Sequence, residues 1–107
     1  MRIAFYGGAN EVGRSCVEVR HGRKRLLLDA GVKIGRVEEH PLLPMSSVPT
    51  HIVITHSHLD HAAYLPHIFR RRSRKKVYMT KPTRDLLQLM IADYMRVSRA
   101  PFDNSKV

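Results

Sequence analysis

The sequence predicts an α/β (α+β) fold in which helices cover a mixed β-sheet. Three observations support this prediction. Short apolar segments with strand-like alternation occupy residues 1–30. An apolar strand at 51–55 leads directly into a helical segment, and a shorter strand at 77–79 leads into a long amphipathic helix. The chain of 107 residues, 43% hydrophobic and 26% charged, has the length and composition of one small globular domain.

Strands and turns dominate the first half of the chain. Three strands are expected there, at residues 2–6, 16–20 and 25–28. Val17 and Val19 alternate with polar neighbours, as in a strand with one buried face. The glycine-rich segment 7–13 lacks the motifs of phosphate-binding and dinucleotide-binding loops. Residues 31–50 contain three prolines without a clear period, so we expect a loop.

Two helices are expected in the second half. The first should begin near Asp60 and run to about Arg71, with a kink or an early end at Pro66. The second should begin near Pro82 and stop at Pro101. Its apolar residues recur at helical spacing and predict a wide buried face, formed by Leu86, Leu87, Met90, Ile91, Tyr94 and Val97.

The run from Thr55 to His61 is the most informative part of the chain. It places three imidazoles and one carboxylate, those of His56, His58, Asp60 and His61, directly after a buried strand. Neutral imidazole with carboxylate suits zinc and related metals. His56 and His58 are two residues apart in an extended segment, so they should reach one metal together. Asp60 and His61 follow the turn into the helix and are expected to face a second metal. The alternative is a set of ordinary surface or core histidines.

Asp29 lies at the end of another predicted strand, beside a glycine. It is a candidate for orienting a ligand histidine from behind. The alternative is a strand-end carboxylate that accepts backbone N–H bonds. The other histidines do not share the ligand spacing: His51 and His67 are expected to be non-ligands, and His21 and His40 to be solvated in turns.

The net charge of +10 is unevenly distributed. Residues 70–107 carry 11 of the 19 basic side chains but only 3 of the 9 acidic ones. This asymmetry suggests a polyanionic partner such as nucleic acid, and the alternative is a solvated basic surface. The densest basic run, a candidate nucleic-acid contact or a complement to a helix dipole, consists of Arg70, Arg71, Arg72, Arg74, Lys75 and Lys76.

The chain contains one cysteine, Cys16, which excludes an internal disulfide and fits a reducing cytoplasm. At its position in a strand it is expected to be buried. No apolar run approaches the length needed to cross a membrane, so no membrane association is expected.

The run His56–His61 matches the signature of the metallo-β-lactamase superfamily. Further segments resemble the N-terminal part of the β-CASP ribonucleases, as found in the endonuclease subunit of the cleavage and polyadenylation specificity factor and its archaeal homologues. These segments are residues 7–15, 28–31, 60–66 and 77–86.

The resemblance implies the N-terminal half of an αββα sandwich, with residues 1–107 as a partial metallo-β-lactamase domain. It implies two zinc ions and hydrolysis of RNA phosphodiester bonds in mRNA 3′-end processing. By position, His56 and His58 would bind the first zinc, while Asp60 and His61 would bind the second. Asp60 would also be catalytic, and Asp29 would support the ligand loop.

Departures from the family pattern limit what this chain is expected to do alone. Later ligands, the second half of the sandwich and the β-CASP domain are not found in the sequence, and Ala63 replaces a common glycine. Four ligands shared by two metals predict weak metal binding and little activity without a complementary chain. Two alternatives remain: a non-catalytic RNA-binding or assembly module, and a fragment of another hydrolase of this fold acting on a thioester or lactam.

Overall fold

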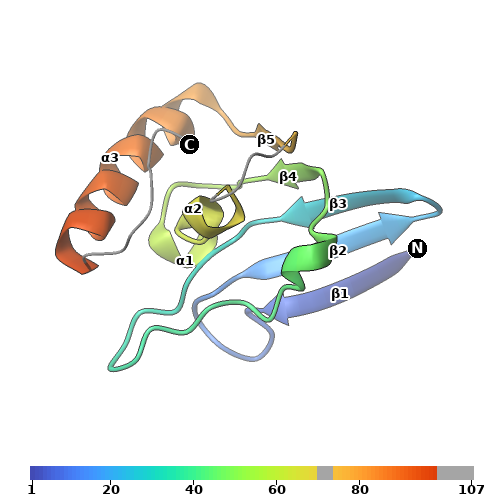
Figure 1. Ribbon diagram of the computed structural model, residues 1–107, viewed down its shortest axis with the longest axis horizontal. Helices are drawn as coiled ribbons and strands as arrows, with labels where there is room; N and C mark the ends of the chain where they lie inside the picture. The colour runs from blue at the N-terminus through green and yellow to red at the C-terminus, as the bar shows by residue number, and fades with distance from the viewer. Residues whose placement is uncertain (70–73, 99–107) are drawn as a thin grey trace.

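The computed structural model describes residues 1–69 and 74–98, except for the side chains of Val97 and Ser98. Five strands form one sheet in sequence order (Figure 1): β1 (Arg2–Gly7), β2 (Cys16–His21), β3 (Lys24–Leu28), β4 (His51–Val53) and β5 (Lys76–Tyr78). The first three strands pair antiparallel, and β3, β4 and β5 pair parallel. The predicted mixed sheet is therefore confirmed.

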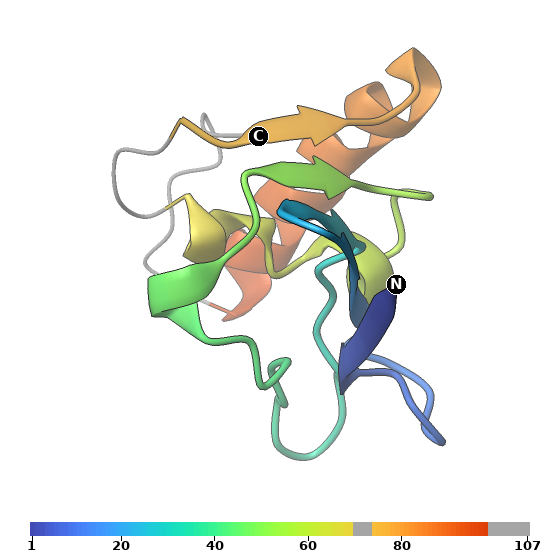
Figure 2. The same ribbon diagram turned by 90° about the vertical axis from the view of Figure 1, so that its right-hand side faces the viewer.

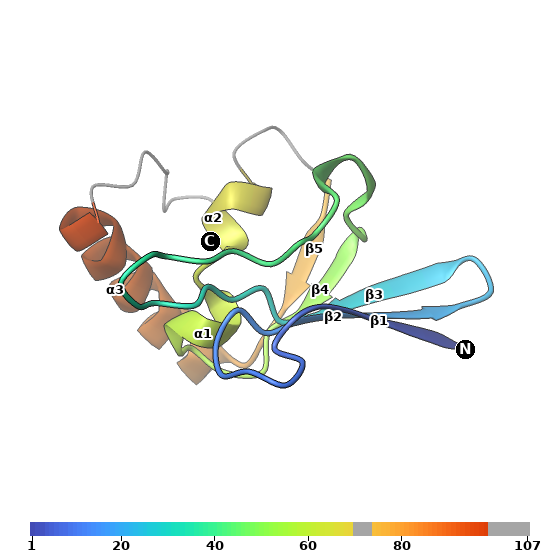
Figure 3. The same ribbon diagram turned by 90° about the horizontal axis from the view of Figure 1, so that it is seen from below.

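Helices lie on one side of the sheet (Figures 2 and 3). They are the 3-10 helix η1 (Met45–Ser47), the short helices α1 (Leu59–Ala62) and α2 (Leu65–Ile68), and the long helix α3 (Lys81–Ser98). No described helix is long and apolar enough to cross a membrane.

The helix expected to begin near Asp60, with a kink or an early end at Pro66, is interrupted: α1 ends at Ala62 and α2 begins at Leu65. Pro66 has no N–H and cannot continue the hydrogen-bond ladder of α1, whereas it is tolerated in the first turn of α2. The N–H of Tyr64 instead donates to the carbonyl of Ala30 at 2.8 Å. Two separate short helices thus replace one continuous helix. The expected end of the helix, from residue 70 on, lies outside the described residues.

Helix α3 buries a narrower face than predicted. Leu87, Ile91 and Tyr94 are buried, but Leu86 is 54% exposed. The three buried residues are spaced four and three positions apart and form one stripe along the helix. Leu86 lies beside this buried stripe and not within it. At the start of α3, the N–H of Thr83 donates to the hydroxyl oxygen of Thr80 at 3.3 Å. The predicted stop at Pro101 and the side chain of Val97 lie outside the described residues.

The two faces of the sheet differ in what covers them. On the covered face, Leu27 and Ile52 are fully buried in a core shared with the helices. The opposite face is called the open face here. Strand register places eight apolar side chains on it: Ile3, Phe5, Val17, Val19, Leu26, Leu28, Val53 and Tyr78. Ile3, Phe5 and Tyr78 remain 55%, 63% and 48% exposed.

Candidate metal centre

The predicted ligand run lies where β4 ends and the chain turns into α1. The ligand atoms of His56, His58 and Asp60 all lie within 4.8 Å of one another. His58 precedes the first turn of α1, and this turn brings the Asp60 carboxylate toward the two histidines. The structure therefore groups Asp60 with His56 and His58, whereas the sequence analysis assigned Asp60 with His61 to a neighbouring position.

His61 adjoins the same cluster. Its ring centroid lies 3.9 Å from that of His56, and its Nε2 atom lies 3.6 Å from Asp60 Oδ2. All four predicted ligands are thus neighbours, although they come from a strand end and a helix. His61 is 26% exposed and Asp60 39% exposed at the side chain, so the cluster remains open to solvent.

Asp29 contacts the cluster from the end of β3. Its Oδ2 atom lies 2.8 Å from His61 Nδ1, and its Oδ1 atom accepts the N–H of Thr55 at 2.8 Å. The Thr55 hydroxyl donates to the same carboxylate at 2.9 Å. Because an ionised carboxylate only accepts hydrogen bonds, His61 Nδ1 is the donor in this contact, and Nε2 is the ring nitrogen on the side of Asp60. Asp29 therefore makes both contacts weighed from the sequence, one to a candidate ligand histidine and one to a backbone N–H.

Backbone hydrogen bonds hold the residues after β3 against α1. Ala30 N–H donates to the carbonyl of His61 at 2.8 Å, and Val32 N–H donates to that of Leu59 at 3.1 Å. From the glycine-rich segment, Ser15 N–H donates to the carbonyl of Asp60 at 3.0 Å. The ligand run is fixed by two segments remote in sequence, so its geometry does not depend on its own turn alone.

Gly31 makes this close approach possible. A Cβ atom at this position would lie 2.7 Å from the His61 nitrogen and closer still to the Asp60 carbonyl group. Only glycine leaves room for the α1 backbone here. Sequence reasoning placed Gly31 in a family-like segment but did not identify this contact. Thr55 and Ser15 were missed as well, since no local pattern marks a residue that acts through a distant backbone.

Glu11 orders the glycine-rich segment. Its carboxylate accepts the N–H of Gly8 at 3.1 Å and pairs with Arg14 at 2.8 Å and Lys33 at 3.4 Å. The hydrogen bond from Arg14 lowers the pKa of Glu11 below its ordinary value. These contacts hold the loop that supplies Ser15. Sequence reasoning did not single out Glu11.

Cys16 lies buried in β2 as expected. Burial raises the pKa of its thiol to about 12, so the group stays protonated at neutral pH. Cys16 is not part of the described group of His56, His58 and Asp60.

His40 has more contacts than expected for a solvated turn residue. It is half-buried, with 36% of its side chain exposed, its Nε2 lies 2.6 Å from Glu38, and its ring centroid lies 4.5 Å from that of His67. The packing of the 31–44 loop against α2 causes this burial. His21 and His51 are exposed.

The described part of the predicted basic run lies away from the ligand cluster. Arg70, Arg71 and Arg72 fall outside the described residues. Arg74 and Lys76 are exposed and Lys75 is half-buried. Lys76 begins β5 and pairs with His51 at the start of β4, whereas the ligands follow the end of β4. The sheet therefore separates the described part of this run from the candidate ligands.

The four ligands suit a divalent transition metal. Zinc binds imidazole nitrogen and carboxylate oxygen at about 2.0–2.2 Å, so two ligands of one ion lie at most about 4.4 Å apart. A spread of up to 4.8 Å closes to this limit with a small side-chain rotation. The contact between Asp29 and His61 is the outer hydrogen bond common for a metal-binding histidine. The residues present therefore fit the metal.

Comparison with known proteins agrees with this geometry. Residues 9–97 match the profile of the Metallo-beta-lactamase superfamily. The chain belongs to this superfamily. The match covers all four candidate ligands, Asp29, and every described strand and helix after β1 except the last residue of α3.

Three relatives show the range of similar proteins. The Probable RNase MJ4 of Methanocaldococcus jannaschii is 35% identical, over all of this chain and 26% of its own length. The Transcription termination factor FttA of Methanococcus maripaludis is 38% identical, over 92% of this chain and 16% of its own. The Endoribonuclease YSH1 of Eremothecium gossypii is 36% identical, over 97% of this chain and 14% of its own length. These relatives confirm the resemblance to β-CASP ribonucleases. The present chain spans about a quarter or less of the length of each of these relatives.

Proposed function

We propose that this chain is the N-terminal, metal-binding segment of a zinc-dependent RNA endonuclease that acts in RNA 3′-end processing. One observation carries the proposal: His56, His58, Asp60 and His61 converge at the end of β4, with Asp29 behind them. Two of the three relatives carry the names RNase and endoribonuclease, which supports RNA as the substrate.

In this proposal the four residues from His56 to His61 hold zinc, and the geometry suits His56, His58 and Asp60 for the first ion. Bound zinc would supply Lewis acidity and a nucleophile at neutral pH for phosphodiester hydrolysis. Asp29 holds the proton of His61 at Nδ1 and leaves Nε2 directed at the ligand cluster. Asp60 is the residue of the set proposed to act in catalysis as well as in metal binding.

We also propose that the chain is one part of a divided sandwich domain. The open face exposes large apolar side chains, among them Phe5 and Ile3. An apolar sheet face of this kind is normally packed against a second layer. A complementary segment or chain would cover this face and complete the ligand set, because four side chains are too few for two zinc ions. The buried, unpaired Cys16 supports a cytoplasmic location.

The test has two steps. The chain is titrated with zinc by calorimetry, with His58→Ala as the variant and His21→Ala, an exposed histidine outside the cluster, as the matched control. The first should lose binding and the second should retain it. The chain is then combined with the remainder of a ribonuclease relative, and zinc-dependent RNA cleavage is measured. Cleavage that survives His58→Ala, or zinc binding equal in both variants, refutes the proposal.

A second candidate is a non-catalytic RNA-binding or assembly module. The observation that favours it is the net charge of +10 beside a ligand set too small for two metals. It predicts RNA binding that is unchanged by chelator and no cleavage after complementation. The two-step test therefore separates the candidates.

A further inference from the structure

Thr55 connects Asp29 to a second candidate ligand, His56. Its hydroxyl donates to the Asp29 carboxylate, whose two oxygens lie at 2.9 and 3.0 Å, and the same hydroxyl oxygen lies 3.0 Å from His56 Nδ1. The Asp29 side chain is only 7% exposed and also contacts His61 at 2.8 Å. The carboxylate therefore reaches His61 directly and His56 through one hydroxyl group.

The single proton of the Thr55 hydroxyl decides the direction of these hydrogen bonds. A hydroxyl has one proton to donate and two lone pairs that accept. A buried carboxylate needs donors, and a hydrogen bond to an ionised group is roughly twice as strong as one between neutral groups. The proton therefore goes to Asp29, and the hydroxyl oxygen is left to accept from His56. This requires a proton on Nδ1 of His56 and leaves Nε2 as the ring nitrogen with a free lone pair.

The two ends of this connection come from neighbouring strands. Asp29 directly follows β3 and Thr55 comes shortly after β4, and these strands pair parallel with Leu28 opposite Val53. The N–H of Asp29 donates to the carbonyl of Val53 at 2.8 Å, and the N–H of Thr55 donates to the Asp29 carboxylate at 2.8 Å. Main-chain N–H groups therefore fix both residues, so the Thr55 hydroxyl can be removed without removing the bonds that hold the backbone.

We propose that Thr55 is a positioning residue of the candidate metal centre: its hydroxyl links His56 to Asp29 and holds that imidazole with Nδ1 protonated and Nε2 available to a metal. A hydrogen bond on one ring nitrogen fixes which nitrogen binds metal and how the ring is oriented. One carboxylate thereby sets two candidate ligands, His61 directly and His56 through the hydroxyl. The role of His56 as a ligand rests on the proposed function, whereas the position of its proton is a property of the metal-free chain.

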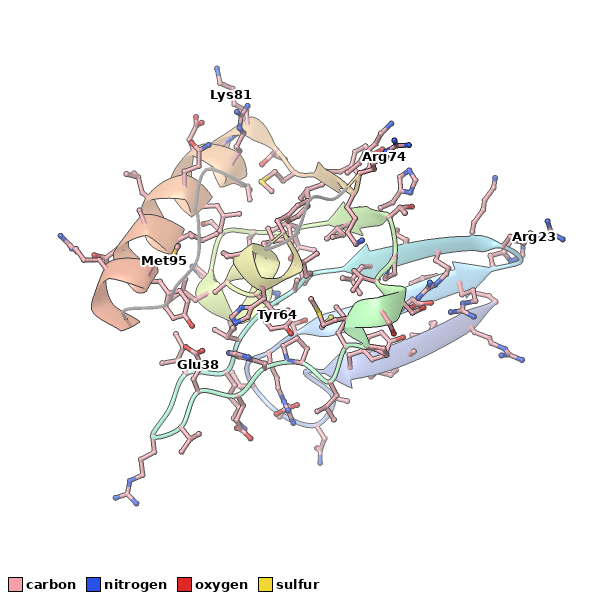
Figure 4. All side chains as sticks on the ribbon, viewed as in Figure 1. Arg23, Glu38, Tyr64, Arg74, Lys81 and Met95 are labelled. Carbon is pink, nitrogen blue, oxygen red and sulfur yellow. The ribbon has the colours of Figure 1, made fainter. Side chains whose placement is uncertain are left out.

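The chain contains a second threonine–histidine pair that serves as a comparison. The hydroxyl oxygen of Thr50 lies 3.0 Å from His51 Nδ1, the same distance as in the pair of Thr55 and His56. No carboxylate of the described residues accepts from the Thr50 hydroxyl, so its proton remains available to His51. This pair lies at the start of β4, on the side of the sheet where the β2–β3 hairpin turns (Arg23 in Figure 4), and the ligand run follows the other end of the strand. The contact with Asp29 thus distinguishes the pair at the ligand run.

The test determines the tautomer of each histidine by long-range ¹⁵N–¹H correlation in the full chain without metal, at about pH 8.5, where imidazoles are neutral. His56 should carry its proton on Nδ1 in the wild type and in Thr55→Ser, which keeps the hydroxyl. Thr55→Val keeps the branched shape and the N–H but removes the hydroxyl, so His56 should become a mixture of both tautomers. Thr50→Val, the matched control, should leave His56 unchanged. An unchanged His61 in every variant shows that Asp29 keeps its place.

Zinc affinity, measured by calorimetry, is the second readout. Thr55→Val should weaken zinc binding about tenfold, and Thr55→Ser and Thr50→Val less than about threefold, since loss of an outer hydrogen-bond partner typically costs about 10–100-fold. Circular dichroism confirms the fold of each variant.

A proton on Nε2 of His56 in the wild type would overturn the proposal, and this result does not depend on whether any variant folds. Equal tautomers and equal zinc affinities in Thr55→Val and Thr55→Ser would overturn it as well. A chain that binds no zinc would refute the proposed function, whereas the tautomer of metal-free His56 would still decide the role of Thr55.

Discussion

Replacing Gly31 by alanine should break the attachment of the ligand run to the sheet. The φ angle of Gly31 is not in the left-handed region, so the effect of the methyl group is purely steric. The new Cβ atom would lie 2.7 Å from the His61 nitrogen and closer still to the Asp60 carbonyl group. Both are main-chain atoms of α1, which cannot rotate away as a side chain does. The two segments must therefore separate.

The cost follows from the hydrogen bonds that cross this contact. The carbonyls of His61, Leu59 and Asp60 accept from the N–H groups of Ala30, Val32 and Ser15, and the Tyr64 N–H donates back to Ala30. If the separation breaks two of these four bonds in a buried setting, the loss is about 2–6 kcal/mol, at about 1–3 kcal/mol for each unsatisfied group. This is a large part of the roughly 5–15 kcal/mol that stabilises a typical domain.

Urea unfolding followed by circular dichroism measures this loss. Gly35→Ala is the matched control, because the nearest atom to its new Cβ would be the Val37 carbonyl oxygen at 3.9 Å. That change should alter the free energy of unfolding by less than about 1 kcal/mol. If Gly31→Ala matches its control, the close approach of α1 does not exist as described and the assembly of the metal cluster needs another explanation.

Three further predictions concern single side chains. Asp29→Asn suits the positive φ of this residue but presents an amide to His61, so zinc affinity should fall about 10–100-fold in calorimetry. Hydrogen bonding to Arg25 is the main cause that lowers the pKa of Glu18 from 4.5 to about 2. Its folded pKa is below the unfolded value, so about 2–3 kcal/mol of stability is present above about pH 4.5 and is lost as the pH falls toward 2. Glu18→Gln should therefore flatten the profile of urea stability between about pH 5 and 3. Leu87→Ala should cost about 2–5 kcal/mol in urea, and Leu89→Ala, at a 71% exposed position, less than about 0.5 kcal/mol.

Each of these has a result that contradicts it. Unchanged zinc affinity in Asp29→Asn would remove His61 orientation as the role of Asp29. A pH profile in Glu18→Gln that parallels the wild type would show that this buried carboxylate does not titrate as described. Equal losses for the two leucine variants would contradict the burial pattern of α3.

Local pattern was sufficient to predict the strands and to single out the candidate ligands. Alternation of apolar side chains reports which face of a strand is buried, and four metal-ligand side chains within six residues mark a site before any fold is known. The same reasoning allowed for an early end of the helix after Asp60, but it did not predict two separate helical turns. Pro66 identified the place where a ladder ends, but the bond from Tyr64 to Ala30, 34 residues earlier in the sequence, directs the chain there. Reasoning from the sequence pattern also placed Leu86 in the buried face of α3. Residue spacing alone does not show how much of a helix surface the rest of the protein covers.

The sequence by itself determined which residues are the candidate metal ligands, because imidazoles and a carboxylate directly after an apolar strand form a local pattern typical of a metal site. Tertiary structure decided how they meet. Parallel pairing of β3 with β4 brings Asp29 to His61, and the absence of a side chain at Gly31 lets the backbone of α1 approach. These contacts join residues far apart along the chain. A periodicity or motif within one segment does not predict where the backbone of a distant segment will lie.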